Sequence, residues 1–157
     1  MHATIKSGLN AHKGLCPRSE SHLTYTTGIA LANRGKGRIT VNIQGDGDFM
    51  CAPGILWTAA HHHIPLLTIM HNNRAYHQEV MHIQRMANRH QRGTLNAGIG
   101  TTIVEPNINY AKLADSMGVW AEGPITSPAE LGSALKRAID IVKRGEPALL
   151  DVVTEPR

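Results

Sequence analysis

The sequence has few aromatic side chains and no long apolar run. Aromatic residues make up 4% of the 157 residues, so a folded core has to be built mainly from aliphatic side chains, alanine and methionine. No stretch of about 18 consecutive apolar residues occurs, which argues against a membrane-spanning helix. The N-terminus lacks the hydrophobic centre of a signal peptide. We therefore expect a cytoplasmic protein that does not enter a membrane.

Cysteines and blocks of like charge are also scarce. Cys16 and Cys51 are far apart and lack the spacing of metal ligands, so we expect thiols in a reducing compartment. The formal net charge is only +4, and no run of about five or six like charges marks a nucleic-acid-binding tail. The content of 41% hydrophobic and 18% charged residues is that of a globular domain.

Short apolar segments alternate with segments of helical spacing along most of the chain. Such alternation predicts βαβ units, in which a parallel sheet is covered on both faces. The predicted fold class is α/β, with a three-layer, doubly wound, mainly parallel sheet and helices on both faces. No element is predicted in residues 1–24. Strands are expected at 38–44, 64–70, 119–123 and 147–154, and helices at 25–37, 52–63, 107–118 and 127–145, with a polar helix or a partly ordered segment at 77–93.

Two polar motifs follow two successive predicted strands. "GDG" (45–47) comes after the first, and "HNN" (71–73) comes after the next. In open parallel sheets, ligands bind beyond the carboxyl ends of the strands, so both motifs are expected on the same rim. Gly45 and Gly47 let the backbone approach a ligand closely. The GDG tripeptide alone would more often be a plain turn, and its pairing with HNN is what strengthens the prediction.

Oxygen atoms dominate the ligands that these motifs offer. Asp46 supplies a carboxylate, Asn73 an amide oxygen, and Ala75 a backbone carbonyl. This set suits Mg²⁺ or Ca²⁺ rather than Zn²⁺, and Mg²⁺ usually completes its coordination with phosphate oxygens and water. Amides at the start of the helix after Gly47 could help to hold a diphosphate. The motifs together predict a magnesium–diphosphate site.

The same motifs carry a family resemblance. "GDGDFM" followed by "HNN" resembles the diphosphate-binding motif of thiamine diphosphate-dependent enzymes. The stretch 45–79 is similar to the acetolactate synthase-like group, and the resemblance extends over residues 26–157 through "NINYAKLADSMGV", "EGPI" and "GEPALLDVVT". It implies the thiamine diphosphate-binding fold for residues 26–157. Residues 1–25 then form a divergent segment that could be poorly ordered.

The resemblance also implies roles for individual residues. Its Mg²⁺ ligands correspond to Asp46, Asn73 and the carbonyl of Ala75, and its cofactors are thiamine diphosphate and Mg²⁺. No catalytic residue is assigned in this chain. The full set implied to bind the cofactor is Gly45, Asp46, Gly47, Asp48, Asn73, Ala75 and Tyr76.

A second module is the main partner that the resemblance implies. In the family, a separate pyrimidine-binding module supplies the glutamate that activates the cofactor, and Glu79 lies in the wrong module to do so. The chain is therefore not expected to be active alone. Joined to such a module, as a separate chain or an upstream segment, it would act on 2-oxo acids as a decarboxylase, synthase or lyase within a homo- or hetero-oligomer.

One departure from the family pattern keeps alternatives open. Residues 17–25, "PRSESHLTY", stand where the family has a glycine-rich apolar stretch beside the diphosphate. The alternative is a catalytically incompetent, truncated domain that is retained as a folded or interaction module. A third interpretation, a basic α/β domain that binds nucleotides or nucleic acid, is the least favoured.

Overall fold

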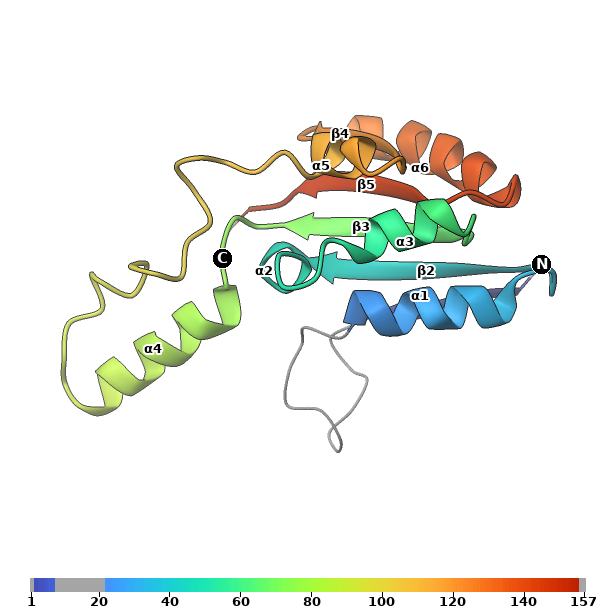
Figure 1. Cartoon of the computed structure of the whole chain (residues 1–157). Helices are drawn as coiled ribbons and strands as arrows, with labels where there is room; N and C mark the ends of the chain where they lie inside the picture. Colours follow the sequence, from blue (N-terminus) through green and yellow to red (C-terminus); the bar gives the residue numbers. More distant parts are fainter. Residues whose placement is uncertain (1, 8–21, 156–157) are drawn as a thin grey trace.

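The chain forms a five-stranded sheet that is parallel throughout (Figure 1). The computed structural model describes residues 2–7 and 22–155. In these residues no helix is long and apolar enough to cross a membrane. The strand order is β1-β2-β3-β5-β4. The strands are β1 (His2–Ser7), β2 (Arg38–Gly45), β3 (Leu66–Asn72), β4 (Trp120–Ile125) and β5 (Ala148–Val153).

Helices cover both faces of the sheet, which confirms the predicted fold class. Neighbouring strand residues point to opposite faces, and Leu66 and Leu67 accordingly belong to two different core clusters. One cluster joins the sheet to α1, α3 and α5, and the other joins it to α6. The helices are α1 (His22–Asn33), α2 (Asp46–Phe49), α3 (Ile55–His61), α4 (His77–Arg89), α5 (Tyr110–Ser116) and α6 (Pro128–Lys143).

The crossover rule explains why α6, unlike the other described helices that pack on the sheet, lies on the opposite face. The chain adds β1, β2 and β3 in one direction, passes over one position to β4, and returns to place β5 between β3 and β4. Parallel crossovers are right-handed, so a connection that runs back must cross on the opposite face. Helix α6 makes that return connection, and its buried residues Ala134, Ala138 and Val142 pack on the sheet.

The contact between α1 and β2 is polar although it is buried. Thr26 Oγ1 donates to Asn42 Oδ1 at 3.3 Å, and Asn42 Nδ2 donates to Gln44 Oε1 at 3.1 Å. Nearer the end of the helix, Asn33 Nδ2 donates to Thr40 Oγ1 at 3.2 Å. The side chains beneath α1 therefore form hydrogen bonds with one another, as buried polar groups must.

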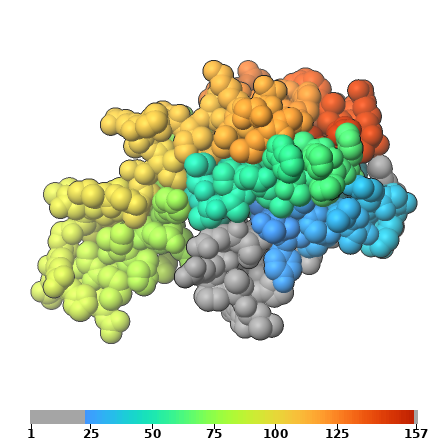
Figure 2. Space-filling model, in the orientation of Figure 1, coloured from blue at the N-terminus to red at the C-terminus, as the bar shows by residue number. Residues whose placement is uncertain are grey.

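Helix α4 projects away from the body of the domain (Figure 1). None of its residues is buried, and the exposed fractions of Met81, Ile83 and Met86 are 39%, 40% and 39%. In the space-filling view, α4 and the segment that follows it form a separate lobe beside the sheet (Figure 2). The sequence allowed either a polar helix or a partly ordered segment here, and the structure has a helix.

Three local predictions were wrong. Residues 1–24 were expected to contain no element, yet β1 pairs in parallel with β2, from His2 opposite Arg38 to Ser7 opposite Ile43. The GDG motif was expected to be a turn, but Asp46–Phe49 forms the short helix α2. The HNN motif was expected to be a loop, but β3 continues through Asn72. Residues 8–21 of the N-terminal segment, which include Cys16, lie outside the described residues.

Candidate functional site

The carboxyl ends of three adjacent strands bring the predicted site residues together. In the sheet, Gly45 at the end of β2 pairs with His71 of β3, and Asn72 at the end of β3 pairs with Val153 of β5. The residues that come next, Asp46, Asn73 and Thr154, therefore leave the sheet on one rim. This is the rim on which ligands bind in parallel α/β sheets.

Asp46 is a buried carboxylate with one unused oxygen. Its side chain is 2% exposed, and Oδ1 accepts a hydrogen bond from the Gly47 N–H at 2.9 Å. Oδ2 is buried and has no hydrogen-bond partner among the described residues. Burial raises the pKa of Asp46, whereas the backbone N–H groups of Gly47, Arg74 and Ala75 act to lower it. These amide contacts place Asp46 beside the segment that carries Asn73.

The segment after β3 turns sharply at Arg74. Asn73 is half-buried, and its Oδ1 accepts from the Ala75 N–H at 3.2 Å, which fixes the direction of the side chain. Arg74 has a φ of +59°, an uncommon conformation for a residue with a side chain and one that is enriched at functional sites. The Tyr76 N–H donates to the Thr101 carbonyl at 2.8 Å. Residues 73–76 are therefore held in one conformation beside Asp46.

A glycine is required where α2 meets this segment. A Cβ atom added to Gly47 would lie 2.5 Å from the ring of Tyr76, closer than real Cβ contacts come. Tyr76 is half-buried, and its pKa is raised by burial and by the negative charges of Cys51, Asp46, Asp48 and Glu79. Among the predicted residues, Gly45 and Asp48 are half-buried beside Asp46 in the chain. The rim is thus acidic, which favours a cation.

Sequence analysis missed a second buried carboxylate, Asp151. It is fully buried in β5, where Oδ1 accepts from Asn72 Nδ2 at 2.9 Å and Oδ2 accepts from the Tyr110 N–H at 3.1 Å. Burial raises its pKa, and the hydrogen bonds from Asn72 and Tyr110 and the charge of Arg74 oppose the rise. An aspartate inside the apolar run "PALLDVV" was the available signal.

Tyr110 interacts electrostatically with both buried carboxylates, Asp46 and Asp151. It is 1% exposed, and its ring meets that of Phe49 edge to face at a centroid distance of 5.4 Å. Its hydroxyl is buried without a hydrogen-bond partner among the described residues. Burial raises the pKa of Tyr110 well above its usual value, and the charges of Asp46 and Asp151 raise it further.

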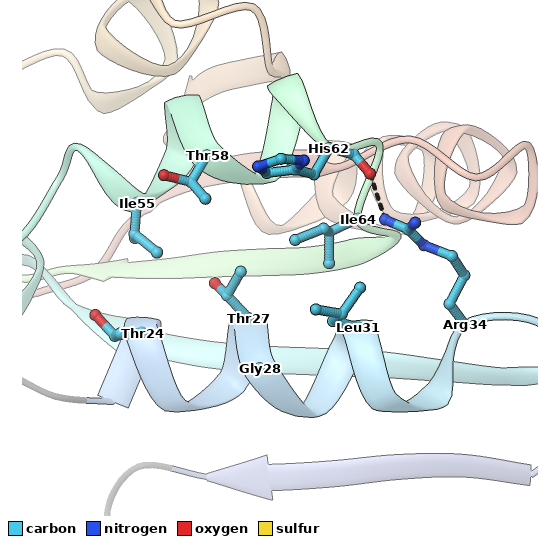
Figure 3. A pocket seen from close by; sticks show the side chains of 9 residues that line it. All are labelled: Thr24, Thr27, Gly28, Leu31, Arg34, Ile55, Thr58, His62 and Ile64. Atoms are coloured by element: carbon cyan, nitrogen blue, oxygen red, sulfur yellow. Dashed lines mark hydrogen bonds between the residues drawn. The ribbon is translucent and has the colours of Figure 1, made fainter.

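A cavity elsewhere in the domain has a different character. It has a volume of about 370 Å³ and lies between α1 and α3, where Thr27, Leu31, Ile55 and Ile64 line it (Figure 3). Arg34 closes one side by donating to the backbone carbonyl of His62. None of the predicted site residues lines this cavity. The described residues contain no cluster of three or more histidine, cysteine, aspartate or glutamate side chains that could hold a metal ion.

Comparison with solved structures reproduces the fold. A thiamine diphosphate-dependent 4-hydroxybenzoylformate decarboxylase of Rhodococcus jostii RHA1 superposes with a TM-score of 0.73 at 23% sequence identity. The match covers 88% of this chain and 23% of the decarboxylase. At this level of identity, the likeness establishes a shared fold.

Sequence comparisons give the family. The protein named "Putative acetolactate synthase large subunit IlvX" of Mycobacterium tuberculosis is 29% identical over 125 residues, which are 80% of this chain and 23% of that protein. The chain thus spans about a quarter of the length of these relatives. The family model described as "Thiamine pyrophosphate enzyme, C-terminal TPP binding domain" matches residues 8–152. The chain therefore belongs to the thiamine pyrophosphate enzymes, within their C-terminal TPP-binding domain family.

Proposed function

We propose that this domain holds Mg²⁺ and the diphosphate of thiamine diphosphate at the rim formed by Asp46 and residues 73–75. The observation that carries the proposal is the buried Oδ2 atom of Asp46, for which residues 2–7 and 22–155 supply no hydrogen-bond partner. A buried carboxylate oxygen without a hydrogen bond is energetically unfavourable unless a ligand satisfies it. A hard divalent cation is the ligand that best suits carboxylate, amide and carbonyl oxygens together.

The residues present fit that ion. Asp46 would supply Oδ2, Asn73 would supply its amide oxygen, and Ala75 would supply its carbonyl. The bend at Arg74 turns residues 73–75 toward Asp46, since the N–H groups of Arg74 and Ala75 already interact with the Asp46 carboxylate. When bound, thiamine diphosphate supplies the chemistry of carbon–carbon bond cleavage and formation on 2-oxo acids. The chain's own part is to bind and orient the diphosphate end.

We also propose that activity requires a separate pyrimidine-binding module. Helix α4 and the segment after it leave apolar side chains in solvent, with Leu95 99% exposed and Ile99 77% exposed. Exposed apolar groups gathered on one lobe are characteristic of a surface that another protein covers. Since the relatives are about four times longer than this chain, their remaining length can accommodate such a module.

Calorimetry can test the binding function directly. The 157-residue chain is mixed with the pyrimidine-binding module of an acetolactate synthase-like relative and titrated with thiamine diphosphate, with and without Mg²⁺. We expect binding only with Mg²⁺, and a loss of at least about a hundredfold in Asp46→Ala because the charged ligand is removed. Asp140→Ala, on the exposed face of α6, is the matched control and should bind normally. Unchanged binding by Asp46→Ala would show that the metal site is assigned wrongly.

A further inference from the structure

Asp151 is a fully buried carboxylate within the sheet, and the burial of an ionisable group usually costs stability. Its exposed fraction is 0%, and no side-chain cation forms a salt bridge with it among the described residues. Both oxygens are nevertheless satisfied, by Asn72 Nδ2 and by the Tyr110 N–H. A well-packed apolar residue would often stabilise such a position at least as well as a buried charge. The groups to which the Asp151 carboxylate is hydrogen-bonded therefore indicate its role.

The first group that Asp151 holds is the last residue of β3. Asn72 donates its side-chain amide to Asp151, and its backbone carbonyl accepts from the Thr154 N–H at 2.8 Å. The end of β3 is thus fixed to β5 through both side chain and backbone. Asn73 follows at once, so the orientation in which the chain leaves Asn72 determines where the Asn73 side chain lies.

The second group is the start of α5. Oδ2 accepts from the Tyr110 N–H at 3.1 Å, and the Ala111 N–H also interacts with the carboxylate. Asp151 therefore joins three segments that are far apart in the sequence, since Asn72 lies 79 residues away and Tyr110 lies 41 residues away. An ionised carboxylate is suited to this position because it accepts at both oxygens, whereas an amide offers only one acceptor.

We propose that Asp151 is a positioning residue for the metal site. It fixes Asn72 relative to α5, so that residues 73–75 stay beside Asp46 before the ion binds. This role rests on the proposed function of the Asp46–Asn73 rim. A preorganised ligand set binds an ion more tightly than a mobile one because less conformational freedom is lost on binding.

Hydrogen exchange and cofactor binding together test the proposal. Asp151→Asn replaces one of the two acceptors by a donor, so either Asn72 or Tyr110 loses its partner. We expect the Ala75 and Tyr110 amides of the full chain to exchange roughly tenfold faster or more, as measured by NMR. The dissociation constant for thiamine diphosphate, with Mg²⁺ and the pyrimidine-binding module present, should rise roughly tenfold. Asp140→Asn serves as the exposed control and should change neither quantity.

Exchanging the two partners provides the decisive variant. In Asp151→Asn combined with Asn72→Asp, the new amide can donate to residue 72 and still accept from the Tyr110 N–H. Both hydrogen bonds return, with donor and acceptor reversed only in the bond between residues 72 and 151, so exchange protection and cofactor affinity should recover to within about threefold of the unmodified chain. A residue that matters only for packing would show no such recovery.

The outcomes separate this proposal from the function on which it rests. If the unmodified chain fails to bind thiamine diphosphate with Mg²⁺, the proposed function is wrong, and exchange at Ala75 still reports whether Asp151 orders the segment. Normal exchange at Ala75 in Asp151→Asn would overturn the positioning role. If that variant does not fold, Asn72→Ala removes only one bond and should accelerate exchange at Ala75 more than at Tyr110. Equal acceleration at both amides would contradict the proposal.

Discussion

Two aspartates near strand ends on either side of β3 are buried to a similar degree but differ in what surrounds them. Asp46, directly after β2, has one carboxylate oxygen bonded to Gly47 and one oxygen without a hydrogen-bond partner in the described part of the chain. Asp151, near the end of β5, has both oxygens occupied by protein donors. Burial raises the pKa of each. An incompletely bonded carboxylate can still accept a ligand, whereas a fully bonded one holds together the groups that donate to it, so we expect the two residues to respond differently to substitution.

Removing each carboxylate in turn should give the largest difference in stability between the variants of the two aspartates. Asp151→Ala leaves the Asn72 amide and the Tyr110 N–H buried without acceptors, so we expect the free energy of unfolding to fall by about 3 to 5 kcal/mol. Asp46→Ala removes a carboxylate that is itself only partly bonded, and the fall should be less than about 1 kcal/mol. Urea unfolding monitored by circular dichroism measures both. Equal losses would remove the distinction between the two residues.

The glycines that adjoin the two carboxylates extend the comparison. A Cβ on Gly123 would lie 2.7 Å from both the Cβ and the backbone oxygen of Asp151, at a φ of +143°. Because backbone cannot move aside, Gly123→Ala should cost about 2 to 3 kcal/mol. At Gly47 the obstacle is the side chain of Tyr76, so Gly47→Ala should cost about 1 kcal/mol and be relieved by Tyr76→Ala. No relief in that double variant would mean that the clash lies elsewhere.

The effect of pH should differ between the two carboxylates once Mg²⁺ is added. Without the ion, both pKa values are raised above 3.8, so each aspartate stabilises the fold fully below that pH and loses this contribution as pH rises through its folded pKa. Mg²⁺ binds only the ionised form of Asp46, so its binding opposes this loss at Asp46. The stability that Mg²⁺ and thiamine diphosphate add should therefore grow as pH rises from 3.8 towards the folded pKa of Asp46, by at most about 1.4 kcal/mol per pH unit.

Variants of the two aspartates test whether the Mg²⁺-dependent gain in stability depends on Asp46. Unfolding curves collected across the acidic range should show the Mg²⁺-dependent gain in the unmodified chain and no gain in Asp46→Asn. Asp151→Asn should retain the gain at a higher Mg²⁺ concentration, because its carboxylate is not a ligand. A gain that persists in Asp46→Asn would place the ion elsewhere.

The smallest expected effect concerns the hydroxyl that both carboxylates influence. Tyr110→Phe removes a buried O–H group to which no described residue is hydrogen-bonded, so the free energy of unfolding should stay the same or rise by less than about 1 kcal/mol. Phe49→Leu, which reduces the ring contact at 5.4 Å, is the contrasting variant and should destabilise the fold. Differential scanning calorimetry can resolve the two, and a clear loss in Tyr110→Phe would reveal an unseen partner for the hydroxyl.

The sequence predicted the elements whose signals are local. Four of the five strands and α6 followed from the alternation of short apolar segments with segments of helical spacing. Strand β1 was missed because "HATIKS" is too polar to indicate a strand by itself, and its place depends on pairing with β2. Helix α2 was missed because four residues give no helical periodicity.

The site residues also divide into those with a local sequence signal and those that depend on distant parts of the chain. Asp46 and Asn73 could be predicted because each follows a strand in a recognisable motif, although their roles remain proposals. Asp151 could not, because its hydrogen-bond partners lie 79 and 41 residues away in the chain. A single polar residue in an apolar strand signals that something is unusual, but only the tertiary structure identifies the groups that it bonds.

The polar contact beneath α1 has a consequence for how the chain finds one structure. Two aliphatic surfaces can pack in several alignments of similar energy. The Thr26–Asn42 and Asn33–Thr40 hydrogen bonds, in contrast, form in only one alignment of helix and strand. A shift of α1 along β2 by one residue would leave several buried amide and hydroxyl groups without hydrogen-bond partners. The α1–β2 contact therefore specifies a single alignment of α1 on β2 and disfavours shifted packings that an all-aliphatic contact would tolerate.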